Sequence, residues 1–466
     1  WGVCWAVAVA AALRLRLPRR RALLLIVGAG LALRVAALAG PPITSDDLFR
    51  YSWDGRVQAQ GVDPYAQPPA SASLGALREP WLWPTPAGCA ARHRPPGCTL
   101  INRPAVRTIY PPVAEGWFAA VYRVGGISAR HKAWQVAGLL TEAAVLALLP
   151  LAIKRHGRDP RWVVLYALCP APVIELVNNG HVDGLAIALM VASLVVVAAP
   201  TPGSGRLGPV ARDVVFGALV GAAAGVKLYP AVLMLALVGA ARPERLASWL
   251  RSAAAAATVL ALAYLPHVVA VGWRVLGYLP GYLREEKYDQ GGRFLVAGAL
   301  RVPAHLAGPV SALALVAAVA FVLWRRPPVA QAACLLLGVV LLATSPVQPW
   351  YAVSLLAMAT VAARPVWAVV VVAGYPYFWA VILNQGHTTE VGQLAYTAAA
   401  VVVAVVAVAT WVLSRGRQDA PCSTPNRADL LGFNRGDRGG DDGAGSERRR
   451  TGAGRGGAVA RGQTTR

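Results

Sequence analysis

Charged residues are scarce in this sequence. They make up 14% of the 466 residues, against 56% hydrophobic residues, whereas a soluble protein carries roughly 25% charged residues. This composition excludes an ordinary soluble domain. Apolar runs of about 17–25 residues recur along the chain, and each is long enough to cross a bilayer as a helix. Because lipid offers the backbone no hydrogen-bond partner, the predicted fold class is all-α, a polytopic integral membrane protein.

Several common signatures are also missing. The sequence has neither a P-loop nor a Rossmann fingerprint, so it predicts no nucleotide site. None of the six cysteines has the spacing to histidine that a zinc site requires. Cys89 and Cys98 share one polar loop and can form a disulfide if that loop is extracytoplasmic. No internal repeat is visible, which counts mildly against common transporter architectures.

The net charge of +23 does not indicate a nucleic-acid partner. The arginines lie mainly in short loops and near the C-terminus, where membrane topology and anionic lipid headgroups explain them. Membrane lipids are therefore the predicted surroundings. We expect the native start to precede Trp1, and no cleavable signal peptide is recognisable.

Short basic loops mark the cytoplasmic side. They lie at 14–21, 154–161, 206–212, 242–251, 325–326 and 364, followed by a basic tail. The apolar spans between them predict about 11–13 transmembrane or re-entrant helices. These spans lie near 22–40, 133–153, 162–178, 184–199, 252–270, 306–324, 329–345, 350–363, 366–383 and 392–413, with part of another at 1–13. We predict a membrane domain over 1–413, a large extracytoplasmic loop with interfacial helices over 41–132, and a disordered cytoplasmic tail over 414–466.

The segment 214–240 has basic loops on both sides but is too short for two full crossings. It contains Lys227, Tyr229 and Pro230 in its middle, so we predict two short helices that meet at a partly buried turn. The alternative is one long tilted helix with Lys227 snorkelling. That alternative would invert every later loop and place Arg325 outside.

The densest group of charges follows the apolar run 22–40. Within residues 45–56 it contains the adjacent carboxylates Asp46 and Asp47, and a helix capped by Thr44 or Ser45 is expected to begin there. If these charges have only a structural role, we expect an interfacial helix in which Asp46 and Asp54 both pair with Arg50. The amphipathic stretch 113–124 is expected to lie in the interface as well.

These residues resemble a known family. The string from Ser45 through Asp46, Asp47, Arg50, Tyr51, Trp53, Asp54 and Arg56 to Asp63-Pro64-Tyr65 is similar to the first external loop of GT-C glycosyltransferases. In particular it resembles glycosyltransferase family 87 and its actinobacterial mannosyltransferases. Later landmarks follow in the same order, at 110–112, 179–184, 227–230 and 349–351, so the resemblance covers about residues 22–413.

The resemblance implies a polyprenyl-phosphate sugar donor, most simply a mannose donor, and a glycolipid or cell-envelope glycan as acceptor. It places transfer on the extracytoplasmic face of a bacterial plasma membrane and makes Asp46 and Asp47 a modified Asp-x-Asp motif. Either carboxylate can deprotonate the acceptor hydroxyl, and attack opposite the phosphate would invert the anomeric centre. The pair could also hold a divalent cation such as Mg²⁺ or Mn²⁺, although adjacent acids alone do not require one.

Other residues are candidates for binding the substrates. The departing phosphate needs cations, for which the candidates are Arg50, Arg56, Arg107 and Lys227. Sugar or lipid contacts are predicted for Tyr51, Trp53, Asp54, Tyr110, His181, Asp183, Tyr229, Trp350, Tyr351 and His387. Structural roles stay open for several of these, because Asn178, Asn179 and His181 can cap helix ends and aromatic residues populate membrane interfaces. The charged run 285–289 is expected to be solvated, with gating of an acceptor as the alternative.

The competing function class is a transporter or flippase of lipid-linked sugars. Such a protein should carry functional polar groups at mid-membrane depth and on both faces. Here the unusual polar residues fall on one predicted face, beside the large loop, which favours the enzyme.

Overall fold

The computed structural model describes residues 1–14, 16–198, 207–239 and 245–418, and helices are the regular elements throughout these ranges. The α-helices are α1 (Gly2–Arg14), α2 (Arg19–Ala36), α3 (Asp47–Ala59), α4 (Pro86–Ala90), α5 (Pro112–Arg155), α6 (Val164–Ala167), α7 (Asp183–Val197), α8 (Pro209–Ala224), α9 (Val232–Gly239), α10 (Arg245–Val271), α11 (Leu279–Glu285), α12 (Leu295–Ala299), α13 (Ala304–Arg325), α14 (Val329–Thr344), α15 (Tyr351–Ala362), α16 (Ala368–Ile382) and α17 (Thr388–Gln418).

The helices confirm an all-α, polytopic membrane protein. Within the described residues, six helical segments are long and apolar enough to cross a membrane, or seven if the bent pair Pro160–Ala167 and Pro172–Asn178 forms one span. Further apolar helices, such as α7, α14 and α15, have only 10–17 residues. The predicted crossing or re-entrant segments therefore include helices shorter than the roughly 20 residues of a full crossing.

The chain divides into two units, Trp1–Thr410 and Trp411–Arg466. Of the second unit the structure describes the end of α17, through Gln418. Most of the predicted disordered tail, 414–466, lies outside the described residues, and that prediction stays open.

The segment 214–240 is interrupted at the predicted place. Helix α8 ends at Ala224, and after a break that contains Lys227 the chain forms a 3-10 turn, Tyr229–Ala231, and then α9. The break is sheltered, because Val226 is fully buried and Lys227 is largely so. The structure thus has two short helices in place of one long tilted helix.

Helix α5 joins two segments that the sequence analysis separated. It is kinked where Gly126 and Arg130 take left-handed φ angles of 64° and 44°. Its first part is the predicted amphipathic stretch, whose buried Phe118 packs against Tyr51 of α3. Gly55 permits this contact, because a Cβ there would lie 2.5 Å from the Phe118 carbonyl oxygen.

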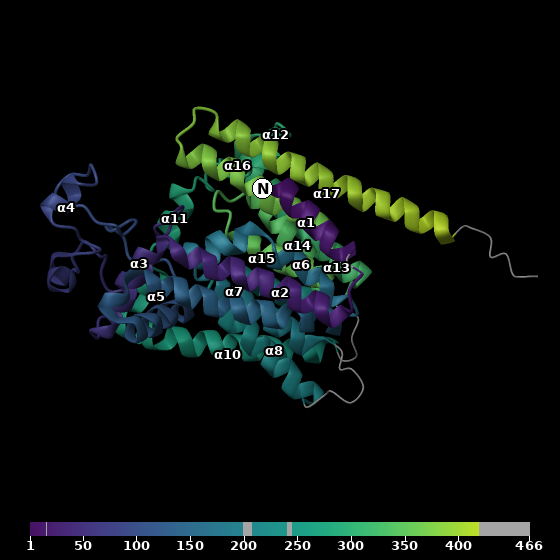
Figure 1. The fold of residues 1–466 in the computed structure, drawn as a ribbon, viewed down its shortest axis with the longest axis horizontal. Coiled ribbons are helices and arrows are strands. Elements are labelled where there is room, and N and C mark those ends of the chain that lie inside the picture. The colour runs from purple at the N-terminus through teal and green to yellow at the C-terminus, as the bar shows by residue number, and fades with distance from the viewer. Residues whose placement is uncertain (15, 199–206, 240–244, 419–466) are drawn as a thin grey trace, which may run out of the picture. The chain divides into compact units, whose positions relative to one another are not determined.

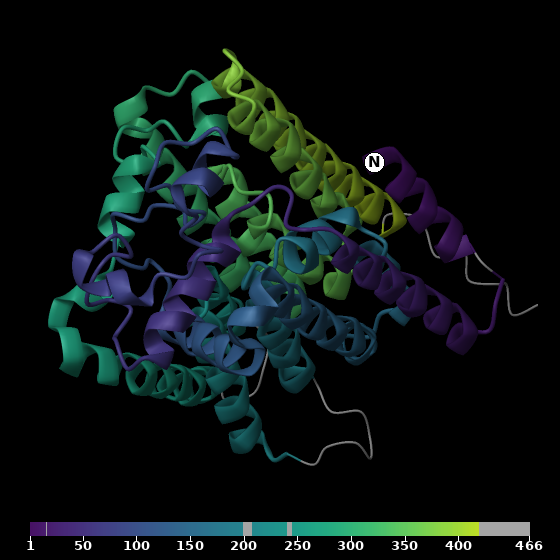
Figure 2. The ribbon, with the colours of Figure 1, turned by 60° about the vertical axis from the view of Figure 1, so that its left-hand side comes forward.

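Two helices of the predicted external loop, α3 and α4, lie at one end of the first unit together with α11. Figures 1 and 2 show α3, α4 and α11 at this end, while the turn from α1 to α2 lies at the opposite end. The loop after α3 has its own small apolar cluster, which includes Trp53, Leu74 and Leu82. Cys89 and Cys98 in this loop form a disulfide.

Candidate active site

The acidic pair stands at the N-terminus of α3. The helix begins at Asp47, and the Asp47 N–H donates to Ser45 Oγ at 3.2 Å, so Ser45 orders the first turn. Carboxylates suit this end of a helix because the helix dipole is positive there. Of the two predicted ion pairs, Arg50–Asp54 is present at 2.9 Å, whereas no Asp46–Arg50 bond occurs among the described side chains.

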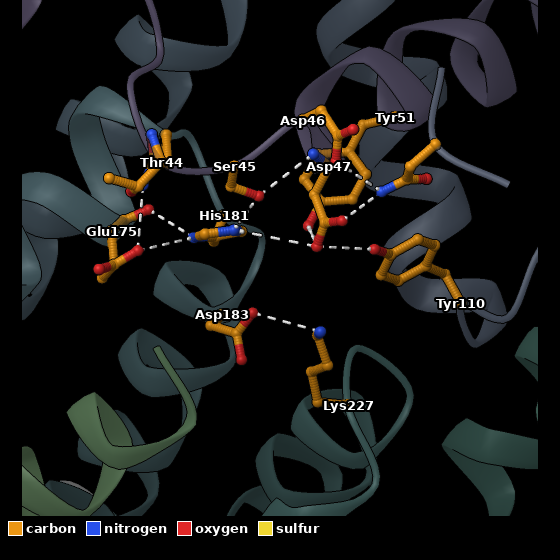
Figure 3. A network of polar contacts seen from close by, with 12 residues as sticks. Thr44, Ser45, Asp46, Asp47, Tyr51, Tyr110, Glu175, His181, Asp183 and Lys227 are labelled. Carbon is orange, nitrogen blue, oxygen red and sulfur yellow. Dashed lines mark hydrogen bonds and ion pairs between the residues drawn. The ribbon is translucent and has the colours of Figure 1, made fainter. Parts of the chain in front are cut away.

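The two carboxylates have different surroundings, which Figure 3 shows. Asp47 accepts hydrogen bonds from Asn102 Nδ2 at 2.6 Å and from the hydroxyls of Tyr110 and Tyr51 at 3.2 and 3.5 Å. Asp46 accepts one bond from Asn102, at 3.2 Å, and remains exposed. The surrounding protein removes water from Asp46, and this is the largest cause of its raised pKa. The charge of Asp47 raises the pKa further, while the hydrogen bond from Asn102 lowers it.

His181 lies behind the pair in the turn between the 172–178 helix and α7. Its Nδ1 lies 2.8 Å from the Glu175 carbonyl oxygen, which can only accept, so Nδ1 carries the proton. Nε2 then accepts from the Ser45 hydroxyl at 2.9 Å and lies 3.9 Å from Asp47 Oδ2. Burial lowers the pKa of His181, which favours a neutral ring stacked on Trp350 at 4.0 Å.

The same turn holds the chain that leads into the acidic pair. Asn178 and Asn179 accept hydrogen bonds from the backbone of Ile43, and Asn179 also accepts from Thr44 N–H. Asn178 also donates to the carbonyl oxygen of Ala37, the residue that caps the end of α2, so it contacts a helix end as predicted, although of a helix distant in the sequence. The two asparagines fix the position of Ser45 and Asp46 relative to His181.

Lys227 approaches the site from the break between α8 and α9. Its ammonium nitrogen lies 3.3 Å from Asp183 Oδ2, with 12% and 0% of the two side chains exposed. The same nitrogen lies 5.2 Å from the ring centroids of both Tyr110 and Tyr351, within the range of cation–π attraction. Tyr229 donates to Asp183 at 3.4 Å. Lys227 therefore fastens the interrupted helix to α7.

These groups surround a cavity of about 780 Å³, a volume typical of small-molecule sites. It is lined by many of the predicted site residues, namely Asp46, Asp47, Arg50, Arg107, Tyr110, Lys227, Tyr229, Trp350 and Tyr351.

Other predicted site residues do not line this cavity. Tyr51, Asp54, His181 and Asp183 are buried behind its wall and contact the residues that do. Trp53 packs against Trp83 in the external loop. Arg56 binds the Tyr122 hydroxyl at 3.0 Å and Glu79 at 3.3 Å, and His387 is exposed between α16 and α17. The phosphate role predicted for Arg56 would need a movement away from these partners.

Three donors in the cavity wall have capacity left for a ligand. Arg50 Nη2 and Trp350 Nε1 are buried and have no hydrogen-bond partner in the described part of the chain. Arg107 donates to the Ala66 carbonyl at 3.2 Å and has no carboxylate within ion-pair distance among the described residues. A buried donor without a partner is costly, but Arg50 Nη2 and Trp350 Nε1 have almost no accessible surface, so a ligand reaches them only if the wall moves, whereas Arg107 lines the cavity without an ion-pair partner among the described residues.

The sequence analysis missed some lining residues. Asn102 and Arg103 come from the external loop, and Glu286 and Arg293 come from the charged run that was expected to be solvated and from the residues after it. The sequence offers one signal for these residues, the clustering of charges after an apolar span. The same clustering is typical of a solvated loop, so it does not identify a cavity.

A metal site is not preformed here. No group of three or more His, Cys, Asp or Glu side chains could hold a metal ion in the ranges that the structure covers. The Asn102 amide nitrogen bridges Asp46 and Asp47 where a shared cation would bind. These residues do not fit a divalent cation as they stand.

Comparison with known proteins gives one match. The model of a family described as glycosyltransferase family 87 matches residues 109–346, just over half of the chain. No curated protein and no solved structure matches. The matched region includes Tyr110, His181, Asp183 and Lys227, whereas the acidic pair lies before it.

Proposed function

The chain belongs to glycosyltransferase family 87, and we propose that it transfers a hexose, mannose being the first candidate, from a polyprenyl-phosphate donor. The acceptor in this proposal is a glycolipid or a glycan of the cell envelope. Family membership favours transfer over the competing transporter or flippase. Because a family does not fix a substrate, the donor has to be argued from the cavity.

The observation that carries the proposal is the set of free donors beside two carboxylates. Arg50 Nη2, buried and without a partner, and Arg107, without a carboxylate, line the same cavity as Asp46 and Asp47. Guanidinium groups bind phosphate in a fixed fork geometry and strengthen as charge develops on it. A sugar phosphate fits this arrangement, because its phosphate meets the arginines while its sugar faces the carboxylates.

In the proposed reaction, a carboxylate takes the proton of the acceptor hydroxyl. The hydroxyl oxygen forms a bond to the anomeric carbon, and the bond from that carbon to the phosphate oxygen breaks. The electron pair leaves with the polyprenyl phosphate, whose charge Arg50 and Arg107 stabilise. The second carboxylate stabilises the positive charge that builds up on the sugar ring. Attack from the side opposite the phosphate inverts the anomeric centre.

The external face of a plasma membrane is the proposed location of this reaction. Disulfides persist in oxidising compartments, and the Cys89–Cys98 disulfide belongs to the loop that leads from α3 towards the cavity. The basic turn from α1 to α2 lies at the opposite end of the helices (Figure 1), as expected of a cytoplasmic side. Both observations support an extracytoplasmic site.

The test is transfer of radiolabelled mannose from polyprenyl-phosphate mannose into membrane lipids. Wild type, Asp46→Asn and Asp47→Asn are compared at matched expression. We expect transfer by wild type and a loss of at least about 100-fold when the base is neutralised. Full transfer by both variants would refute the role of the pair, and no transfer by wild type would refute the proposed donor.

A further inference from the structure

The cavity has a second polar corner, formed by Glu286, Arg293 and Gln348, all of which line it. The Glu286 carboxylate accepts hydrogen bonds from the Arg293 guanidinium and, at 3.3 Å, from Gln348 Nε2. Arg293 also donates to the Tyr377 hydroxyl. Only 6% of Glu286 is exposed. The proposed reaction gives this corner no role.

The surroundings of the corner make a purely structural role costly. Apolar residues line the cavity beside it, including Phe294, Leu341 and Val347. Removing an ion pair from water costs more than the pair commonly returns, so apolar residues would stabilise this position as well.

The chemistry of the corner matches a sugar ring. A sugar hydroxyl both donates and accepts, and the corner offers a carboxylate acceptor, a guanidinium donor and an amide that does both. The rings of Tyr288, Trp350 and Tyr351 line the same cavity and provide flat apolar faces for the ring C–H groups. A few placed polar groups among aromatic side chains are typical of small-molecule sites.

The corner connects to the acidic pair through a short series of contacts. Asp47 lies 3.9 Å from His181, His181 stacks on Trp350 at 4.0 Å, and Gln348 precedes Trp350 by two positions. The acidic pair and the corner line one cavity, so a donor sugar at the pair and a second ring at the corner would share it. We propose that Glu286, Arg293 and Gln348 form the subsite that binds the hydroxyls of the acceptor's sugar. This rests on the proposed function.

The neighbouring Glu285 provides a matched control. Glu285 itself does not line the cavity, and its carboxylate binds two residues at the cavity wall, Arg103 at 2.6 Å and the Tyr278 hydroxyl at 2.9 Å. Both partners of this ion pair are 40% exposed, and exposed pairs contribute little. The same change from glutamate to glutamine can thus be made at adjacent positions, one inside the cavity and one outside.

The experiment uses the purified full chain, polyprenyl-phosphate mannose as donor and octyl α-D-mannoside as acceptor. For Glu286→Gln we expect the acceptor KM to rise about 10- to 100-fold, because hydrogen bonds to a charged group are lost, while the donor KM stays unchanged. Gln348→Leu, which leaves no charge unpaired, should raise the acceptor KM about 2- to 10-fold. Glu285→Gln should change neither constant.

A rise in donor KM without a rise in acceptor KM would overturn the proposal, as would equal transfer by wild type to octanol and to octyl α-D-mannoside. If Glu286→Gln does not fold, Gln348→Leu decides in its place. Binding is measured separately, as the shift of the unfolding temperature by methyl α-D-mannoside. A shift in wild type that is lost in Gln348→Leu, without transfer by wild type, would retain the subsite and refute the proposed function.

Discussion

Asp46 and Asp47 are adjacent in sequence, but the structure gives them different tasks. The oxygens of Asp47 are engaged by Asn102, Tyr110 and Tyr51. Asp46 has one hydrogen bond and faces the cavity. A base needs a lone pair free for the incoming hydroxyl, so we expect Asp46 to take the proton and Asp47 to face the charge on the sugar ring.

The pH dependence of transfer should report on Asp46. A base acts when ionised, and its surroundings raise the pKa of Asp46, so transfer should fall on acidification at a pH above the ordinary aspartate value of about 3.9. Because the pKa is raised, protonation of Asp46 favours the folded state, and this group causes no acid unfolding. The measurement is kcat/KM against pH, together with the unfolding midpoint at each pH.

Asn102→Leu is the internal check on this assignment. It removes the hydrogen bond that lowers the pKa of Asp46, so the acid limb should move to higher pH. If the acid limb of the pH profile does not move, a group other than Asp46 causes it.

Lys227 and Asp183 form a buried ion pair whose role can be separated from phosphate binding. Lys227→Met leaves the fully buried Asp183 uncompensated, which should cost about 3–5 kcal/mol of stability. The double variant Lys227→Met, Asp183→Asn removes the unpaired charge and should recover most of that stability, as measured by thermal unfolding in detergent. If transfer recovers as well, Lys227 only fastens α8 to α7. If stability returns without transfer, its charge serves the donor.

At the scale of the elements, the contact between α3 and α5 fixes the site. Gly55→Ala would place a methyl group 2.5 Å from the Phe118 carbonyl oxygen, and such overpacking costs about 1–3 kcal/mol. Because Arg50 and Asp54 lie on the same helix, we expect both a lower unfolding temperature and reduced transfer. Gly116→Ala in α5 is the control, since no atom lies within 4 Å of its Cβ position. Equal effects of the two changes would contradict this interpretation.

Some elements could be predicted from the sequence because their cause is local. Lys227 and Pro230 within an apolar segment indicated the break between α8 and α9, and the structure has it there. The sequence analysis separated the stretch 113–124 from the span 133–153, and the structure breaks α5 between them, at the non-helical backbone angles of Gly126 and Arg130. The cavity role of Glu286 was missed because its cause is not local. Its partner Gln348 is distant in sequence, and only the folded chain brings them together.

For the molecule as a whole, the two ends of the helices differ in kind. The disulfide loop, α3 and α11 gather at one end, and the basic turn between α1 and α2 lies at the other (Figures 1 and 2). Such a division agrees with a cytoplasmic side rich in arginine and an external side that holds the site. Individual residues cannot establish it for the later helices, because the direction of every span after 240 depends on whether 214–240 crosses the membrane or returns.

The last prediction concerns this direction, and single cysteines test it. Ala76→Cys and Arg158→Cys place exposed thiols in the external loop and in the turn after α5. A membrane-impermeant maleimide should label Ala76→Cys in intact cells and Arg158→Cys only after permeabilisation. Cys4, which is exposed, and Cys422 are replaced by serine beforehand, while Cys169 and Cys334 are buried and Cys89 and Cys98 are joined.

Arg325→Cys, at the end of α13, then decides how the interrupted segment lies. If α8 and α9 enter and return, this thiol is cytoplasmic and should label only after permeabilisation. If the segment crosses the membrane, the thiol is external and should label in intact cells. Labelling of Arg158→Cys in intact cells, with Ala76→Cys protected, would place the cavity on the cytoplasmic side. An external polyprenyl-phosphate donor could not then reach Asp46, and the proposed function would have to be given up, although the family would stand.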